Sequence, residues 1–178
     1  MITGVISFCN STAFNIKNSE DKQKILDQIN KISGMKIIQK HFDNFNKSHF
    51  RKLNAIPHLI SLKTNGNPYL LFLTKYNFTN VCIFIDKKIR PNYYLPRMII
   101  SHFHFDESLY DNTLLDGEMV IDKNGHWIYI INDIYCYKNK NLQDVNIVKR
   151  LNLLCNLFEN EYKSPSNFLV KNEICIFH

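Results

Sequence analysis

Paired cysteines, long apolar runs and blocks of like charge are all missing from this sequence of 178 residues. The five cysteines are odd in number, lie far apart and form no Cys-x-x-Cys pair, which argues against a disulfide framework and a zinc knuckle. No window of about 18 apolar residues occurs, and the first residues do not have the pattern of an export signal. We therefore expect an intracellular protein of a reducing compartment, without membrane partners.

The positive charge of the chain is moderate and spread along its length. The net charge is +6 and the isoelectric point is near 9.0, but Lys and Arg form no block of five or six residues. The charge therefore suits a phosphate-rich partner but is weak evidence for nucleic acid. The length of 178 residues suits one domain with a real core, or one domain with a short appendage, and the 45% of hydrophobic residues is ample for burial.

The first third of the chain carries the pattern of an amphipathic helix. Asn18 offers an N-cap oxygen, two acidic residues follow it, and apolar residues recur at helical spacing until Gly34. The later segment HFDNFNKSHFRKLN predicts a short helix or an ordered loop. We expect residues 1–56 to form a helical N-terminal extension and residues 57–178 to form the main domain.

Strand patterns dominate after residue 57. The apolar runs are HLISL, YLLFL, VCIFI, YYLPRMII, GEMVI and HWIYIINDIYCY. Asp122-Lys123-Asn124-Gly125 lies between the last two and predicts an antiparallel hairpin. Apolar residues from Leu142 to Phe158 predict a helix that ends near Lys163, and FLVKNEICIFH predicts one more strand. The order of these elements predicts an α+β domain with an antiparallel sheet.

One lysine in the stretch SLKTNGNPYLLFL, which begins at Ser61, allows two interpretations. The first is an ordinary hairpin in which Lys63 lies in water, because an unpaired amine is costly to bury. The second is a nucleophilic amine, whose pKa is lowered by desolvation and by nearby positive charge. The motifs that follow in the chain decide between the two.

Three later segments bear on Lys63 through their order. CIFIDKK ends a strand with one acid and two bases, TLLDGEMV places Asp116-Gly117-Glu118 at the mouth of a strand, and WIYIINDIYCYKNK interrupts a strand with Asn132-Asp133. In this order the four motifs resemble those of the covalent nucleotidyltransferases, which are the mRNA capping guanylyltransferases and the nucleotide-dependent DNA and RNA ligases. Within roughly residues 60–150 the chain looks most like the capping enzymes of large cytoplasmic DNA viruses.

The first motif, together with the strands YLLFL and FIDKK, carries the likeness to the viral enzymes and implies a role for Lys63. SLKTNG is similar to the SLKTDG-type motif of the viral enzymes, with Pro68 where cellular capping enzymes and ligases usually have Arg. By resemblance, Lys63 attacks the α-phosphate of GTP, releases pyrophosphate and passes GMP to the 5′ diphosphate end of RNA. Leu62, Thr64 and Gly66 match the nucleotide-binding turn around the lysine. Glycine suits such a turn because backbone groups can approach the nucleotide closely.

The resemblance also implies an acidic part of the site. Glu118 matches a carboxylate that acts near the ribose, the lysine or a metal ion, and Asp133 matches the nucleotide-binding acid of the next motif. Tyr129 or Ile131 lies on the strand that helps to frame the base. Mg²⁺ or Mn²⁺ is the implied cofactor, with Glu118 as its ligand, since hard cations prefer carboxylate oxygens.

Departures from the family pattern lower the activity that we expect. Asn65 stands where the family has Asp, and Asn132 stands where an aromatic residue often precedes the motif acid. No segment matches the later acid-Gly strand or the Lys-x-Lys strand whose cations hold the α-phosphate, and no OB domain follows. We therefore expect a truncated guanylyltransferase domain that is weakly active or inactive alone, or that requires a second polypeptide. If the source is a virus, we expect it in the host cytoplasm or the virion.

Two other functions stay open at this stage. One is a non-catalytic remnant or binding subunit of a capping enzyme, which Asn65 and the missing motifs favour. The other is a fragment of an ATP-dependent ligase. Among other features, His102-x-His104 has no third ligand and predicts no metal site. The cations Lys138, Lys140, Lys149 and Arg150 fit phosphate contacts or a solvated surface equally well.

Overall fold

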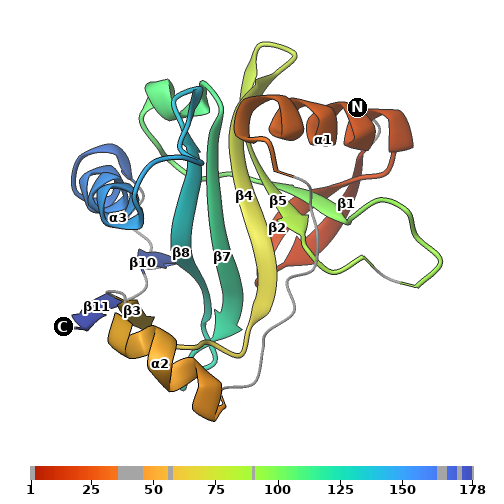
Figure 1. Cartoon of the computed structure of the whole chain (residues 1–178). Helices are drawn as coiled ribbons and strands as arrows, with labels where there is room; N and C mark the ends of the chain where they lie inside the picture. The colour runs from red at the N-terminus through yellow and green to blue at the C-terminus, as the bar shows by residue number, and fades with distance from the viewer. Residues whose placement is uncertain are drawn as a thin grey trace.

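A mostly antiparallel sheet forms the centre of the molecule (Figure 1). The computed structural model describes residues 3–35, 46–55, 58–89, 91–163, 168–171 and 174–177. Within these residues the sheet has nine strands in the order β1-β2-β6-β5-β4-β7-β8-β10, with β9 paired to β8. The strands are β1 (Thr3–Phe8), β2 (Ser11–Ile16), β4 (Asn67–Tyr76), β5 (Thr79–Asp86), β6 (Met98–Ser101), β7 (Thr113–Ile121), β8 (Trp127–Tyr137), β9 (Lys140–Asn141) and β10 (Leu169–Lys171). The predicted α+β class is confirmed.

Helices cover both faces of this sheet. The helical elements are α1 (Ser19–Ser33), α2 (Lys47–Ala55), α3 (Ile147–Asn156), the 3₁₀ turn η1 (Glu107–Tyr110) and the π turn η2 (Leu157–Glu161). Ile25 and Ile29 of α1 pack on one face, whereas Leu154 of α3 and Leu157 of η2 pack on the other. None of the helices in the described residues has the length and apolar character that a membrane crossing requires.

The ends of α1 follow the signals in its sequence. The Asn18 side chain accepts hydrogen bonds from the amides of Glu20 (2.7 Å) and Asp21 (3.1 Å), as an N-cap residue does. Gly34 ends the helix with φ of 64°, a left-handed conformation that glycine adopts without steric cost. The helix predicted between these two residues is confirmed.

Strands β4 and β5 are apolar along most of their length because both of their faces are covered. Leu71, Leu73 and Phe84 belong to the core on the α3 side, whereas Leu70 and Ile83 belong to the core on the α1 side. A strand buried on both faces has no polar alternation, and this explains the runs YLLFL and VCIFI. The two strands therefore form the rigid centre from which the edges of the sheet extend.

The N-terminal segment contains strands that the sequence analysis did not predict. β1 and β2 form an antiparallel hairpin, and β2 pairs with β6 through Phe14 and Asn15. The expectation of a purely helical extension is therefore wrong for residues 3–16, which belong to the sheet. Helix α2 begins at Lys47 within the segment predicted as helix or loop, and residues 41–45 lie outside the described residues. The division of the chain at residue 56 stays a prediction.

The second half of the chain follows the predicted order with two corrections. The β7–β8 hairpin turns at Gly125, which has φ of 83°, and is confirmed. Helix α3 begins at Ile147, later than Leu142, because Asn146 caps it by accepting a hydrogen bond from the Val148 amide. The last segment forms two strands in two sheets, because β10 pairs in parallel with β8 while β11 (Ile174–Phe177) pairs with β3 (His58–Ser61).

Candidate functional site

The turn between β3 and β4 lies against strand β7. Thr64 Oγ1 donates a hydrogen bond of 2.5 Å to Glu118 Oε2, and the Gly66 amide donates one of 3.1 Å to the same oxygen. The pairing of β4 with β7 sets Pro68 opposite Glu118 and positions this contact. Residues more than fifty positions apart in the sequence are thus joined by one carboxylate. Lys63 is the residue immediately before Thr64 in this turn, and it is exposed.

Gly66 allows the turn to approach β7 closely. A Cβ atom at this position would lie 2.6 Å from the Met119 carbonyl oxygen and 2.6 Å from Val120 Cγ1. Both distances are shorter than van der Waals contact, so any other residue would push the turn away from Glu118. Gly117 on β7 is equally confined, since its Cβ would lie 2.8 Å from Tyr129 Cζ. The two glycines therefore bring the turn, β7 and β8 together.

Next to Glu118 along β7, Asp116 is part of a buried ionic contact. Lys87, which follows β5, donates to Asp116 Oδ1 at 2.6 Å, and the Tyr135 hydroxyl donates to Asp116 Oδ2 at 2.8 Å. Burial, together with the negative charge of Asp116, raises the pKa of Tyr135 well above its usual range. Lys87, Asp116 and Tyr135 are not among the site residues predicted from the sequence. The acid-base end of CIFIDKK and the acid before Gly117 were the signals that could have found the first two.

Asp133 has the acidic side chain expected on β8, but both of its oxygens bind Arg150. Arg150 of α3 donates from Nε to Oδ1 at 2.8 Å and from Nη2 to Oδ2 at 2.9 Å. Hydrogen bonding to Asp133 raises the pKa of Arg150, and Arg150 also donates to the Val145 carbonyl at 2.5 Å. This bidentate pair joins α3 to the sheet. This ion pair is enough to explain a carboxylate at position 133, and no ligand is required for it. The nucleotide-binding role of Asp133 stays a prediction.

Tyr129 and Ile131, on the strand suggested to help frame the base, lie on the α3 side of β8. Tyr129 and Ile131 are completely buried in the core on the α3 side, and the Tyr129 hydroxyl donates to the Tyr69 carbonyl at 2.8 Å. Side chains alternate along β7, so Glu118 lies on the opposite face, together with Asp116. Direct contact of Tyr129 or Ile131 with a base on the Glu118 side is therefore excluded. Ile130, which pairs with Glu118, is the β8 residue closest to that position.

The acidic residues near the Lys63 turn do not form a closed metal cage. The described part of the chain contains no group of three or more His, Cys, Asp or Glu side chains arranged to hold a metal ion. Glu118 Oε2 accepts two hydrogen bonds, whereas its Oε1 makes none with the described residues. Magnesium is commonly held by one or two carboxylates together with substrate phosphates and water. The donor set therefore fits an ion that binds with a nucleotide rather than a permanent structural metal.

The sheet is mostly antiparallel, and a carboxylate of β7 holds the exposed turn that carries Lys63. The protein family described as mRNA capping enzyme, catalytic domain, matches residues 14–176. The match covers most of the chain, which therefore belongs to this family. A search of curated proteins gave no match.

Proposed function

We propose that this chain is an mRNA guanylyltransferase domain that forms a covalent Lys63-GMP from GTP and transfers GMP to the 5′ diphosphate end of RNA. The observation that carries the proposal is the double hydrogen bond from the Lys63 turn to Glu118, in a chain that belongs to the capping family. A surface hairpin with its lysine in water requires no such anchor. The anchor supports an interpretation in which the turn is held ready for a nucleotide.

The proposed reaction uses Lys63 as the nucleophile. Its neutral Nζ forms a bond to the α-phosphorus of GTP while the bond to the bridging oxygen breaks, and pyrophosphate leaves with the electron pair. The amine loses one proton and becomes a phosphoamide. In the second step a terminal phosphate oxygen of the RNA attacks the same phosphorus, the N–P bond breaks, and the protonated nitrogen returns as the lysine amine.

Glu118 has two roles in this proposal. Through Oε2 it holds Thr64 and Gly66, and therefore limits the positions that Lys63 can take. Its Oε1 remains for a ribose hydroxyl or for Mg²⁺ or Mn²⁺. When bound, the metal ion would offset negative charge on the phosphates. Leu62, Thr64 and Gly66 form the proposed nucleotide-binding turn.

The alternative is a non-catalytic relative that binds GTP or RNA without transferring GMP. Asn65 favours this alternative, because an Asp in its place would add a negative charge two residues from the lysine. A carboxylate at this position can orient the amine and receive its proton during the attack. Its loss therefore weakens the nucleophile without removing the site.

The test is covalent labelling of the purified chain with radioactive GTP and, separately, ATP in the presence of magnesium. After denaturation we expect weak acid-labile label from GTP only, and none in Lys63→Ala or Lys63→Arg. The arginine variant keeps the positive charge and the hydrogen-bonding capacity but cannot act as the nucleophile. Lys75→Ala is the matched control, since Lys75 is exposed on β4, away from the Lys63 turn.

A parallel binding measurement separates catalysis from binding. Fluorescent GTP that binds the wild type and not Glu118→Ala, without covalent label, would establish the non-catalytic alternative. Preferential label from ATP would assign the chain to the ligases. Neither label nor GTP binding would refute both the enzyme and the nucleotide site.

A further inference from the structure

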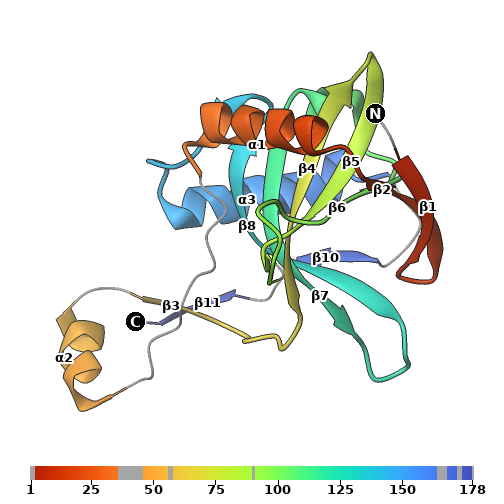
Figure 2. The same ribbon diagram turned by 90° about the vertical axis from the view of Figure 1, so that its right-hand side faces the viewer.

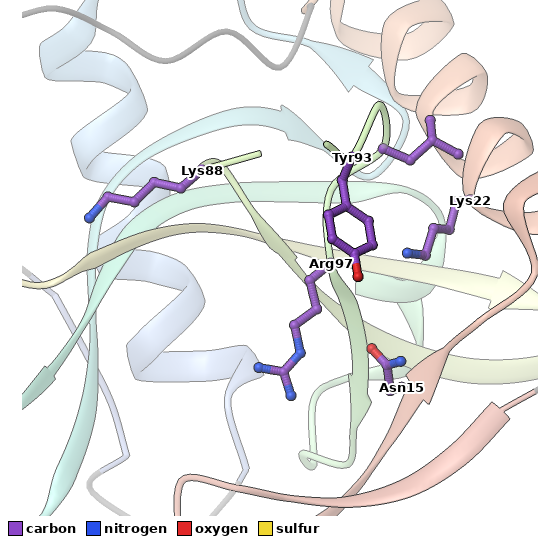
Figure 3. Close-up of a pocket in the computed structure, with 6 residues that line it drawn as sticks. Asn15, Lys22, Lys88, Tyr93 and Arg97 are labelled. Carbon is purple, nitrogen blue, oxygen red and sulfur yellow. The ribbon is translucent and has the colours of Figure 1, made fainter. Parts of the chain in front are cut away.

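A strongly basic pocket is lined by residues other than those of the Lys63 turn. Its volume is about 210 Å³, and it is enclosed by α1, β2, and the segment between β5 and β6. Three cations from these elements line it, together with Asn15, Tyr93 and Leu95; the cations are Lys22, Lys88 and Arg97 (Figure 3). The cations come from distant parts of the sequence, so the fold rather than a local run of basic residues brings them together.

The positive charges of the pocket have no carboxylate partner among the described residues. Within the described ranges, none of Lys22, Lys88 and Arg97 forms an ion pair with a carboxylate, although Lys87, Lys138 and Arg150 all do. Among the described residues, the carboxylate of Asp86 accepts a hydrogen bond from the backbone amide of Lys88 alone, at 2.8 Å. Burial lowers the pKa of Lys22, as expected for a partly desolvated ammonium without an anion. An anionic ligand would restore the electrostatic stabilisation that this cation lacks.

The side-chain oxygen of Asn15 favours a ligand that also carries a hydrogen-bond donor. Asn15 Oδ1 is buried and has no hydrogen-bond partner in the part of the chain that the structure describes, and the side chain of Asn15 lines the same pocket. A buried acceptor without a donor is destabilising, so a ligand hydroxyl would be favoured there. Figure 3 shows the Tyr93 hydroxyl and the Lys22 ammonium on the side of the pocket where Asn15 lies, with Lys88 extending away from them. A phosphate next to a hydroxyl satisfies both groups.

Exposed aromatic rings border the same segment. Tyr93 is 65% exposed and Tyr94 is 95% exposed, both in the connection from β5 to β6. Aromatic rings beside a basic surface are the usual means of binding single-stranded nucleic acid, because bases stack on the rings while cations contact the backbone. A free inorganic anion would use the cations but neither the rings nor Asn15.

We infer that this pocket binds one phosphate-ribose unit of single-stranded RNA, with Lys22 and Arg97 on the phosphate, Asn15 on a ribose hydroxyl and Tyr93 against a base. The inference rests on the proposed function for the identity of the polynucleotide, because a capping domain acts on RNA. It adds an RNA contact outside the Lys63 turn. Such a contact would hold the transcript while its 5′ end reaches the nucleotide site.

Fluorescence anisotropy with a labelled 5′-diphosphate RNA decanucleotide tests this site on the full chain. Arg97→Gln should weaken binding about tenfold at low salt, and Lys22→Gln somewhat less. Each variant should also reduce the slope of log Kd against log salt by about 0.7, the value for one phosphate contact on a single strand. Lys24→Gln is the matched control on α1, since it removes the same charge from an exposed position, and should change Kd less than twofold.

The ribose contact is tested with DNA of the same sequence. RNA should bind about threefold more tightly than DNA to the wild type, and Asn15→Ala should abolish this preference while keeping the salt slope. Equal effects of Arg97→Gln, Lys22→Gln and Lys24→Gln would overturn the site. Equal loss of RNA and DNA binding in Asn15→Ala would overturn the ribose assignment. Competition by GTP that disappears in Arg97→Gln would assign the pocket to a free nucleotide instead.

These measurements do not depend on the reaction of Lys63. RNA binding is read without GTP, and the pocket variants should form as much Lys63-GMP as the wild type. A chain that takes label normally but shows no pocket-dependent RNA binding would refute only this inference. A chain that binds RNA through the pocket without any label would refute only the catalytic function.

Discussion

Glu118 and Asp133 are two carboxylates on neighbouring strands, and the same family resemblance selected both. Glu118 accepts from a hydroxyl and an amide on one oxygen, while its second oxygen makes no bond to the described residues. Both oxygens of Asp133 accept hydrogen bonds from Arg150. The side chains of the Asp133 pair are each only 16% exposed. The comparison indicates that Glu118 is available for a ligand, whereas Asp133 mainly holds a helix to the sheet.

The difference arises where the pairing of β7 and β8 is irregular. The register shifts between Leu114 and Leu115 and again between Asp116 and Gly117, so Tyr135 and Asn132 are extra residues of β8. Such β-bulges turn side chains away from the regular alternation. β7 remains regular through Glu118, whereas the side chains of β8 near Asp133 are redirected. Bulges are common beside active sites, but here they also give Asp133 and Tyr135 their protein partners.

The largest effect is expected for Glu118→Gln on covalent labelling by GTP. Glutamine keeps an acceptor for Thr64 and Gly66 but removes the negative charge, so the initial rate should fall about a hundredfold with little change in stability. The measurement is the rate of label incorporation relative to the wild type. Glu159→Gln, an exposed position in η2, is the control. Label at the wild-type rate in Glu118→Gln would remove this carboxylate from the site.

Asp133→Asn should change the stability of the fold more than the binding of any ligand. Loss of the carboxylate leaves the guanidinium of Arg150 largely buried without its anion, and the free energy of unfolding should fall by about 2–4 kcal/mol. The measurement is urea unfolding followed by circular dichroism. Asp144→Asn removes the same charge from an exposed position close to α3 and should cost less than about 0.5 kcal/mol. Similar costs for the two variants would show that the Asp133–Arg150 contact does not hold α3.

Elements with local signals were predictable from the sequence. Asn18 and Gly34 bound α1, and Gly125 marks the β7–β8 turn, because capping and left-handed turns depend on a few adjacent residues. The antiparallel class followed from the order of the apolar runs. The Lys63 turn and Glu118 could be related only through the family resemblance, since their contact spans 54 positions.

Features that depend on long-range pairing were not predictable. β1 and β2 join the sheet through β6, and nothing in their own sequence identifies β6 as the partner. Arg150 resembled a surface cation, because its match to Asp133 depends on how α3 packs against the bulged strand. The basic pocket needs three elements to be folded together before its charges meet. Spacing along one strand could not reveal any of these contacts.

Thr64→Val should give a smaller effect and tests how firmly Glu118 holds the turn. Valine has the shape of threonine but lacks the hydroxyl that donates to Glu118 at 2.5 Å, so we expect a loss of about 1 kcal/mol in unfolding free energy. Thr64→Ser keeps the donor and should lose less than half as much. Urea unfolding of the two variants measures the difference. Equal losses would mean that packing of the methyl group, rather than the hydrogen bond, holds the turn.

Tyr135→Phe should give the smallest effect, and only at alkaline pH. It extends the comparison to Asp116, because both oxygens of Asp116 accept hydrogen bonds from the protein, as those of Asp133 do. Burial and Asp116 raise the pKa of Tyr135, whereas an unfolded tyrosine ionises near pH 10, so the unfolded state binds fewer protons above that pH. The contribution of this tyrosine to stability is therefore constant below pH 9 and is lost as the pH rises through 10. Between pH 9.5 and 10.5 the unfolding free energy of the wild type should fall by about 0.7 kcal/mol more than that of Tyr135→Phe, measured by urea unfolding at each pH.

Tyr94→Phe is the control: it changes a ring that is 95% exposed and should retain the pH dependence of the wild type. Identical pH dependence in the wild type and in Tyr135→Phe would show that the Tyr135–Asp116 contact opens in solution, which would leave Asp116 available beside Glu118.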